Sequence, residues 1–206
     1  MQIKLLNANL MQGLQKVINV IEKKHAIPIL ANVYIKAENQ ILELIATDLE
    51  VQLSSKIQNL TILKEGNLTV SGRKLFDISR NLPVDAELDI LLDNDDLILT
   101  TQGSFFNLKT LSPDDFPTFS VQQKELILDL CPKLLKRLLE NTIFCVALQD
   151  VRRILNGMLL ELSSNTIKAI GIDGHRLALN SISTDLGVEF CQYILPRKSV
   201  IELNRI

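Results

Sequence analysis

The sequence predicts an α+β fold in which short amphipathic helices alternate with groups of short antiparallel strands. In a few segments apolar residues recur at intervals of three and four, and in most others they alternate with polar residues. The order of these segments also restarts in the second half of the chain. We therefore expect two copies of one α+β unit.

The composition is that of a globular protein with an aliphatic core. The chain has 206 residues, of which 47% are apolar and 22% charged, and this argues against a disordered or collagen-like protein. Trp is absent and aromatic residues make up only 4%, so Leu, Ile and Val must fill the core. No run approaches the roughly 20 apolar residues that cross a bilayer, and the N-terminal segment lacks the apolar run of a signal peptide. We expect a cytoplasmic protein with no membrane partner.

The first half begins with a helix and continues mainly with strands. Helical spacing of apolar residues predicts a helix over residues 8–24, which Pro28 ends. Glu38-Asn39-Gln40 separates two alternating segments and indicates a hairpin turn. A second, shorter helix is predicted over residues 72–82, before Pro83. The strands are expected at residues 32–37, 41–48, 51–62, 67–72, 86–93, 96–103 and 104–111.

The second half repeats this order. Residues 125–130 are predicted to form a strand, and residues 132–147 a helix with Pro132 in its first turn. A shift of 125 residues without a gap aligns the hydrophobic patterns of the two halves, so that Asp48 falls on Asp173. The predicted helix at residues 196–206 then corresponds to the helix at 72–82.

The same shift sets the expected domain organisation. We expect a first unit at residues 1–118 and a second unit at residues 125–206. The counterparts of residues 86–111 would fall at 211–236, so the second unit is expected to be incomplete and the chain to be part of a longer protein.

Charge is segregated between helices and the rest of the chain. The predicted helices at 8–24, 72–82, 132–147 and 196–206 each carry a net charge of +2, whereas the whole chain carries −2, so the remainder carries −10. A face of Lys and Arg neutralises phosphates, and an acidic reverse face discourages binding there. The aromatic residues offer no base-stacking platform, so the pattern favours contact with the phosphate backbone. The alternative is that these helices are merely solvated.

One polar cluster invites a catalytic interpretation. Asp173-Gly174-His175-Arg176 places an Asp and a His two residues apart, as a metal site or a catalytic dyad would. Gly174 instead indicates a turn, whose residues can border an apolar recognition groove. No nucleophile elbow, zinc-protease motif or phosphate-binding loop is present. The three cysteines, Cys131, Cys145 and Cys191, follow no zinc spacing, and we expect reduced thiols, no metal and no cofactor.

A second polar segment, Gln149-Asp150-Val151-Arg152-Arg153, lies between a predicted helix and a predicted strand. Its adjacent arginines suit contact with phosphate, and a solvated turn is the alternative. Lys23-Lys24-His25 follows the first helix at the matching place, which favours a shared role for the two loops.

Several segments, in order along the whole chain, resemble the bacterial DNA polymerase III beta subunit, the sliding clamp. DGHRLA and LNGML are the most specific of them. The segments are Pro28-Ile29-Leu30, Thr47-Asp48-Leu49-Glu50, Arg73-Lys74-Leu75-Phe76-Asp77-Ile78, Asp115-Phe116-Pro117, Gln149-Asp150-Val151-Arg152, Leu155-Asn156-Gly157-Met158-Leu159, Asp173-Gly174-His175-Arg176-Leu177-Ala178 and Pro196-Arg197-Lys198.

The resemblance implies a ring of two subunits, each built from three processivity-clamp domains. It places antiparallel sheets outside and two basic helices per domain inside, around double-stranded DNA that is bound without regard to sequence. This chain then holds the first domain and part of the second, and the third is absent. The implied function is that of a processivity factor for DNA replication with no active site of its own, although catalogues place it with the transferase activity of the polymerase. The replicative polymerase and the clamp loader are expected to bind through peptide motifs.

The resemblance and the charge pattern also imply site residues. Lys24 stands where arginine is frequent in the family, and Arg153 or Ile154 stands where an aromatic residue is usual. DNA contacts are expected from Lys24, Arg73, Gln149, Arg153, Ile154, Arg197 and Lys198. The peptide cleft is expected to include Leu155, Ile172, Gly174, His175, Arg176 and Leu177. The dimer edge is expected to include Lys74, Ile78, Leu82, Phe106 and Leu108.

Two other functions remain open from the sequence alone. A nucleic-acid-binding module that forms no ring would carry the same basic helices. A hydrolase would use Asp173 and His175.

Overall fold

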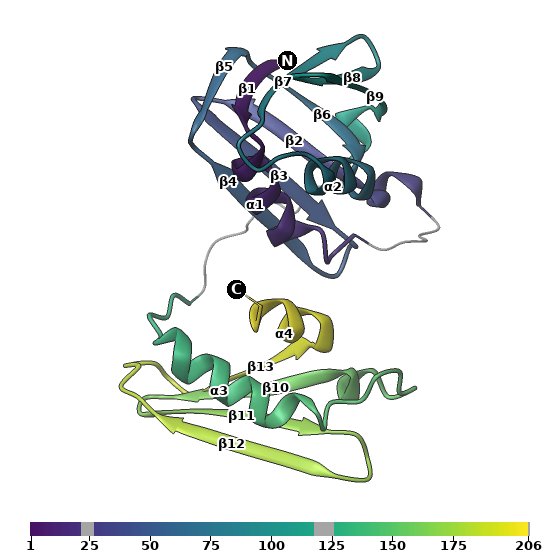
Figure 1. Ribbon diagram of the computed structural model, residues 1–206. Coiled ribbons are helices and arrows are strands. Elements are labelled where there is room, and N and C mark those ends of the chain that lie inside the picture. The colour runs from purple at the N-terminus through teal and green to yellow at the C-terminus, as the bar shows by residue number, and fades with distance from the viewer. Residues whose placement is uncertain (22–26, 118–125, 206) are drawn as a thin grey trace. The chain divides into compact units, whose positions relative to one another are not determined.

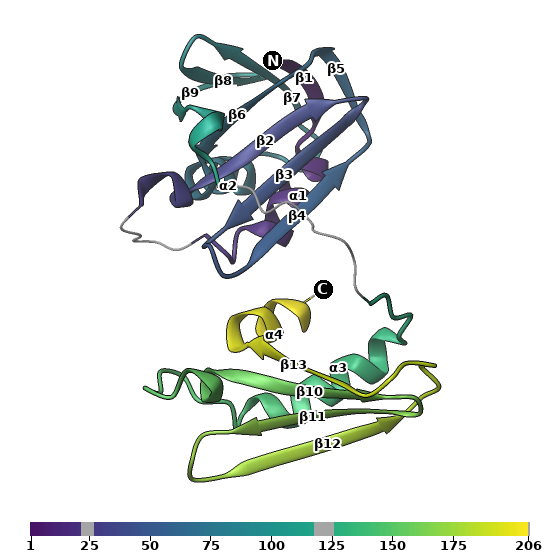
Figure 2. The same cartoon turned by 180° about the vertical axis from the view of Figure 1, so that it is seen from behind.

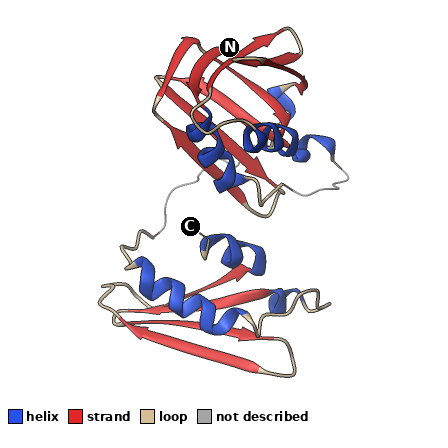
Figure 3. Cartoon of the chain, in the orientation of Figure 1, coloured by secondary structure: helices blue, strands red, loops and turns tan. Residues whose placement is uncertain are grey.

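The computed structural model describes residues 1–21, 27–117 and 126–205. The chain divides into two compact units, Met1–Ser120 and Val121–Ile206, and each is described by itself. Both units place helices on one face of an antiparallel sheet (Figures 1 and 3).

The first unit is a curved antiparallel sheet with two neighbouring helices. Helix α1 contacts β3 and β4, helix α2 contacts β2 and β6, and the two helices contact each other. Seen from behind, strands β2, β3 and β4 lie in front of both helices (Figure 2). The strand order is β4-β3-β2-β6-β9-β8-β7-β1-β5. The elements are β1 (Gln2–Leu6), α1 (Asn7–Val17), the 3-10 helix Pro28–Ala31, β2 (Asn32–Glu38), β3 (Ile41–Thr47), β4 (Gln52–Ile57), β5 (Leu60–Lys64), β6 (Gly66–Ser71), α2 (Gly72–Asn81), β7 (Glu87–Asp93), β8 (Asp96–Thr101), β9 (Ser104–Leu111) and the 3-10 helix Pro113–Asp115.

The second unit repeats the first half of that design. Helix α3 packs on β11 and β12, and helix α4 contacts β10 and β13. The strand order is β12-β11-β10-β13. The elements are α3 (Pro132–Ile143), the 3-10 helix Arg153–Asn156, β10 (Gly157–Ser163), β11 (Thr166–Ile172), β12 (Leu177–Ser183), β13 (Cys191–Pro196) and α4 (Arg197–Leu203).

The strand pairing repeats at a spacing of 125 residues. In the β2–β3 hairpin Glu38 pairs with Ile41, and in the β10–β11 hairpin Ser163 pairs with Thr166. The β3–β4 and β11–β12 ladders, and the β2–β6 and β10–β13 ladders, match in the same way. Since a slip of one residue would turn each core side chain to the other face, this agreement shows the same fold in both units.

The first unit has a closed core, whereas that of the second is open. An apolar groove of ≈ 450 Å³ in the second unit is lined by Leu126, Leu128, Leu130, Leu135, Leu160, Leu162, Ile167, Tyr193 and Leu195. The residues 125 positions earlier are all buried in the first core: Met1, Ile3, Leu5, Leu10, Ile35, Ala37, Leu42, Leu68 and Val70. Leu88 and Ile90 of β7 and Leu97 and Leu99 of β8 belong to that core, and their counterparts would fall beyond residue 206.

The predicted strand at 125–130 was wrong. Residues 126–130 have no regular secondary structure, although Leu126, Leu128 and Leu130 pack against the second core. Their counterpart β1 pairs with β5 and β7. Residues 185–189, which correspond to β5, are irregular, so the described chain holds no counterpart of the β1–β5 ladder for this segment.

Other predicted boundaries also need correction. Helix α1 ends at Val17 and a turn follows it, while residues 22–26 lie outside the described part of the chain. The predicted strand at 51–62 is two strands, β4 and β5, which pair with different neighbours. The later helices end at Ile143 and Leu203, earlier than expected. Strand β1 was not predicted.

Candidate functional site

The described helices expose basic side chains, in keeping with the predicted charge pattern. The exposed members are Lys16, Lys74, Arg80, Lys133, Lys136 and Arg137. Arg80 pairs with Asp77 on its own helix at 3.3 Å, an exposed pair that contributes little stability. Lys24, which was expected to contact DNA, lies outside the described residues, as do Lys23 and His25.

Arg73 binds the backbone just beyond the end of α1, and Arg197 binds the backbone at the last residue of α3 and just beyond it. Arg73 Nη2 donates to the carbonyl of Ile21 at 2.8 Å, and Arg197 Nη1 donates to the carbonyls of Ile143 and Val146, both at 2.7 Å. Ile143 is the last residue of α3, where helix carbonyls carry partial negative charge, and its carbonyl also accepts from the N–H of Val146 at 3.1 Å. The Nε atoms of both arginines are buried without a partner among the described residues, so DNA contact must use the other N–H groups.

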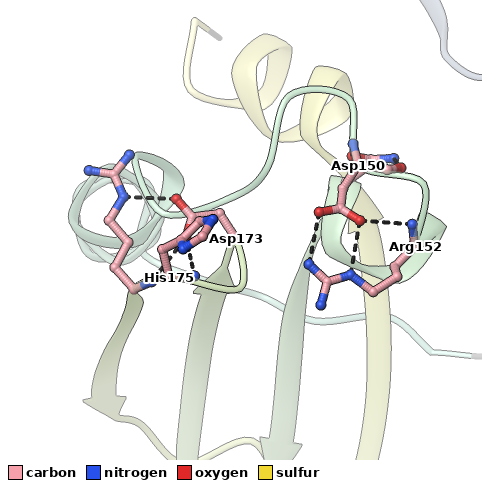
Figure 4. A network of polar contacts seen from close by, with 6 residues as sticks. Asp150, Arg152, Asp173 and His175 are labelled. Carbon is pink, nitrogen blue, oxygen red and sulfur yellow. Dashed lines mark hydrogen bonds and ion pairs between the residues drawn. The ribbon is translucent and has the colours of Figure 1, made fainter.

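Hydrogen bonds among its own residues hold the loop that follows α3. Asn156 donates to the carbonyl of Asp150 at 2.9 Å and accepts from its N–H at 2.8 Å. The Asp150 carboxylate in turn accepts two bonds from the Arg152 guanidinium, at 3.0 and 2.9 Å (Figure 4). The bonds from Arg152 lower the pKa of Asp150 to about 2. This bracing positions the exposed Arg153 and Ile154 just before β10.

The Asp173 turn is held by a second such pair. Asp173 Oδ1 accepts from the backbone N–H groups of His175 and Arg176, both at 3.0 Å, and Oδ2 accepts from Arg176 Nε at 2.9 Å (Figure 4). The backbone bond from His175, then the bonds from Arg176, lower the pKa of Asp173 to about 2. The His175 contact to Asp173 is therefore made by the backbone, and this turn does not form the side-chain dyad that a hydrolase needs.

Arg176 also ties this turn to the end of α3. Its Nη2 donates to the carbonyl of Phe144 at 2.9 Å, and its guanidinium lies 5.6 Å from the centroid of the Phe144 ring. A hollow of ≈ 310 Å³ lies where the turn, the loop and the start of α4 meet, and Gln149, His175, Arg176 and Arg197 are among its lining residues.

The expected cleft residues lie close to this turn but differ in exposure. Ile172 and Leu177 are cross-strand partners at the end of the β11–β12 hairpin and are 36% and 59% exposed. Gly174, His175 and Arg176 are exposed in the turn between them. Leu155 is only 8% exposed, so it presents little surface of its own to a peptide.

The expected dimer edge lies along β9. This strand pairs with β6 only at Leu111 and Thr110, so residues 104–109 present a free edge on that side within the described chain. Phe106, Leu108, Ile78 and Leu82 are partly buried against the first core, and Lys74 is exposed. Lys109, which the sequence did not bring to attention, is on this strand and pairs with Asp96 at 2.8 Å.

In the described parts of the chain no helix is long and apolar enough to cross a membrane. Among the same residues, no three His, Cys, Asp or Glu side chains gather as a metal site would need.

Comparison with known proteins decides the family. The model for the N-terminal domain of the DNA polymerase III beta subunit matches residues 1–120, and the model for its central domain matches residues 129–206. The chain belongs to the DNA polymerase III beta subunit family.

Relatives in this family are similar over the whole chain. The beta sliding clamp of Pseudomonas putida is 44% identical over 198 residues, which cover 96% of this chain and 54% of the relative. That of Haemophilus influenzae is 36% identical over 206 residues, covering 100% of this chain and 56% of the relative. The chain thus spans about half the length of these relatives.

Solved structures of the family share the fold. The DNA polymerase III subunit beta from Pseudomonas aeruginosa matches with a TM-score of 0.96 and 38% identity, and the pol III beta of Caulobacter crescentus with 0.93 and 30%. Each match covers all of this chain and 56% of the other. The predicted α+β clamp fold is therefore confirmed.

Sequence reasoning missed several residues that shape this site. Asn156 and Asp150 lie within longer sequence motifs that do not reveal their hydrogen bonds to each other. The hydrogen bonds from Arg73 and Arg197 to backbone carbonyls have no signal in the sequence. A carboxylate two residues before an arginine, as in Asp150-Val151-Arg152, is a signal that can reveal such a brace.

Proposed function

We propose that this chain is the first and much of the second domain of a sliding clamp, which encircles duplex DNA in the cytoplasm and tethers the replicative polymerase. The observation that carries this proposal is the match of both family models, in order, over residues 1–120 and 129–206. The match favours a ring over a nucleic-acid-binding module that forms none. The clamp acts as a processivity factor and has no chemistry of its own.

DNA binding is assigned to the basic helices and to the loop after α3. The exposed lysines of α1, α2 and α3 attract the phosphate backbone, and Gln149, Arg153 and Ile154 are exposed on the braced loop. Lys24 and Lys198 complete the proposed set. Such contacts carry no sequence information, so binding should be independent of sequence and sensitive to salt.

Partner peptides are assigned to the surface around Ile172, Leu177 and the Asp173 turn. Exposed apolar side chains beside charged ones are typical of a site for a hydrophobic peptide motif. Arg176 and His175 stand in the turn between Ile172 and Leu177, and Leu155 is the buried member of the proposed set. We propose that the polymerase and the clamp loader bind here, and that the third domain supplies the rest of the cleft.

Ring closure is assigned to the free edge of β9. An unpaired strand edge flanked by Phe106 and Leu108 is suited to edge-to-edge pairing with a strand of another subunit. In the full-length protein that strand belongs to the third domain, so the 206-residue chain alone should not close a ring.

Light scattering combined with DNA loading tests the proposal. The 206-residue chain should be a monomer or a weak dimer and should leave nicked circular DNA rapidly. A closed dimer of this chain that stays on circles and leaves linear DNA would contradict the assignment of the β9 edge to the third domain.

A further inference from the structure

The turn at Asp173 has an internal counterpart in the first unit. Asp48 Oδ1 accepts from the backbone N–H groups of Glu50 and Val51 at 3.0 and 2.8 Å. Asp173 Oδ1 accepts in the same way from the backbone N–H groups of His175 and Arg176. Leu49, with φ +75°, occupies the position of Gly174, with φ +87°. The same left-handed turn therefore forms with and without a side chain.

The two turns differ in what surrounds residue 49 and residue 174. Because Leu49 adopts the left-handed conformation, the backbone angle alone does not require glycine here. The difference lies in the surroundings: a Cβ at residue 174 would lie 2.6 Å from Arg152 Nη2 and 3.5 Å from its Cζ. The Arg152 guanidinium thus occupies the space that a side chain would take.

Arg152 is fixed in this place from the loop side. Its guanidinium makes two bonds to the Asp150 carboxylate, and its own N–H donates to Asp150 Oδ1 at 2.8 Å. Asn156 holds the backbone of Asp150 on the other side. A guanidinium held by two parallel bonds has a defined orientation, so the pair with Asp150 fixes the Arg152 guanidinium against Gly174.

The turn meets the loop region at two places. Arg152 packs on Gly174, and Arg176 binds the carbonyl of Phe144 where α3 ends. The segment between these two contacts carries Gln149, and Arg153 and Ile154 follow it. The loop that carries the residues assigned to DNA is therefore joined to the turn at the border of the cleft through Arg152 and Arg176.

We propose that Arg152, oriented by Asp150, is a positioning residue that couples the DNA-contacting loop to the Gly174 turn of the peptide cleft. This inference rests on the proposed function of both surfaces. If DNA shifts the loop, the cleft border shifts with it, and by thermodynamic reciprocity a ligand in the cleft alters DNA affinity by the same factor.

Titration of the ¹⁵N-labelled chain with a 30-base-pair duplex tests the coupling. In the unsubstituted chain, amide signals of Gly174 and His175 should move with those of Arg153 and Ile154, with one midpoint. In Arg152→Gln the loop signals should still move, while the shifts of Gly174 and His175 should fall at least threefold. Arg152→Lys should not restore them, because an ammonium lacks the two-pronged geometry. Lys168→Gln, which removes an exposed charge on β11, serves as the control and should behave as the unsubstituted chain does.

The possible failures are distinguishable. The coupling is refuted, and the DNA assignment stands, in two cases. In the first, the loop signals move with DNA but those of Gly174 and His175 do not. In the second, the signals of Gly174 and His175 move as far in Arg152→Gln as in the unsubstituted chain. If no loop signal moves with DNA in the unsubstituted chain, the assignment of DNA binding to this loop fails, and the coupling fails with it.

A second set of variants tests the contact without DNA. Gly174→Ala should reduce the folding equilibrium constant about two- to fivefold more than Gly187→Ala, because the new Cβ must displace the Arg152 guanidinium from Asp150, whereas Gly187 has φ +60° but nothing within 4 Å of its Cβ position. Adding Arg152→Gln to Gly174→Ala should recover most of that difference. Equal effects of the two alanine substitutions, or no recovery, would show that Arg152 does not press on this turn.

Discussion

Arg73 donates a hydrogen bond to the carbonyl of Ile21 at 2.8 Å, which joins the first turn of α2 to the segment just beyond α1. In the second unit Arg197 reaches the carbonyl of Val146 at 2.7 Å, and a shift of 125 residues places Val146 on Ile21. The two arginines are not themselves equivalent under that shift, yet they hold equivalent carbonyls. Both were expected to contact DNA, so their substitution should affect the fold as well as the ligand.

Replacing Arg197 with Gln should lower the free energy of unfolding by about 1–3 kcal/mol, because the carbonyls of Ile143 and Val146 lose a charged donor. Urea unfolding followed by circular dichroism measures this change. Lys133→Gln, an exposed substitution at the start of α3, should change it by less than about 0.5 kcal/mol. Equal stability of the two variants would show that Arg197 does not hold the end of α3.

Duplex binding by the chain should weaken steeply with salt. With about 3–5 phosphates neutralised, the slope of log affinity against log salt should be near −3 to −4. Lys136→Gln should make this slope less negative by about 0.9 for each lost contact, whereas Lys168→Gln on β11 should leave it unchanged. A flat response to salt, or a strong preference for one base sequence, would argue against a face that binds the phosphate backbone.

The open core of the second unit predicts unequal effects at equivalent positions. Ile3 is fully buried, whereas its counterpart Leu128 borders the open groove. Ile3→Ala should cost about 2–5 kcal/mol of stability, and Leu128→Ala about 1 kcal/mol or less, because Leu128 is only partly buried. Hydrogen exchange measured separately for each unit gives the loss of stability caused by each substitution. Similar losses for Ile3→Ala and Leu128→Ala would mean that the groove is closed in solution.

Acid should loosen both braced segments of the second unit. The carboxylates of Asp150 and Asp173 have pKa values lowered from 3.8 to about 2 by the bonds from Arg152 and from His175 and Arg176. A lowered carboxylate pKa means that the stabilisation is present above the unfolded value near 3.8 and is lost as the pH falls through 2. Carboxyl ¹³C titration should give midpoints near 2 for both groups. Midpoints near 4 would show that the arginine pairs do not form in solution.

The sequence predicted the repeated pattern well, because hydrophobic alternation and turn residues are local properties. Asn39 and Gln40 adopt the left-handed conformation that a two-residue hairpin turn favours, as the Glu38-Asn39-Gln40 segment suggested. Residues 126–130 have the alternation of a strand, but a strand also needs neighbours, and these are not local. Propensity alone therefore gave the wrong assignment there.

The sequence motifs suggest the outline of the candidate site but not the contacts that support it. Exposed members such as Arg153, Ile154 and Leu177 follow from motif position. The burial of Leu155 and the carbonyl contacts of Arg73 and Arg197 depend on where a helix ends relative to a distant side chain. The equivalence of the carbonyls that Arg73 and Arg197 bind becomes visible only when the strand pairing of both units is known.

Retention on circular and linear DNA tests the central claim most directly. The full-length protein, loaded on nicked circular DNA at a salt concentration that abolishes phosphate contacts, should stay on the circle and be lost once the DNA is linearised. Equal retention on both forms, or rapid loss from the circle, would contradict the proposal that this chain forms part of a ring around duplex DNA.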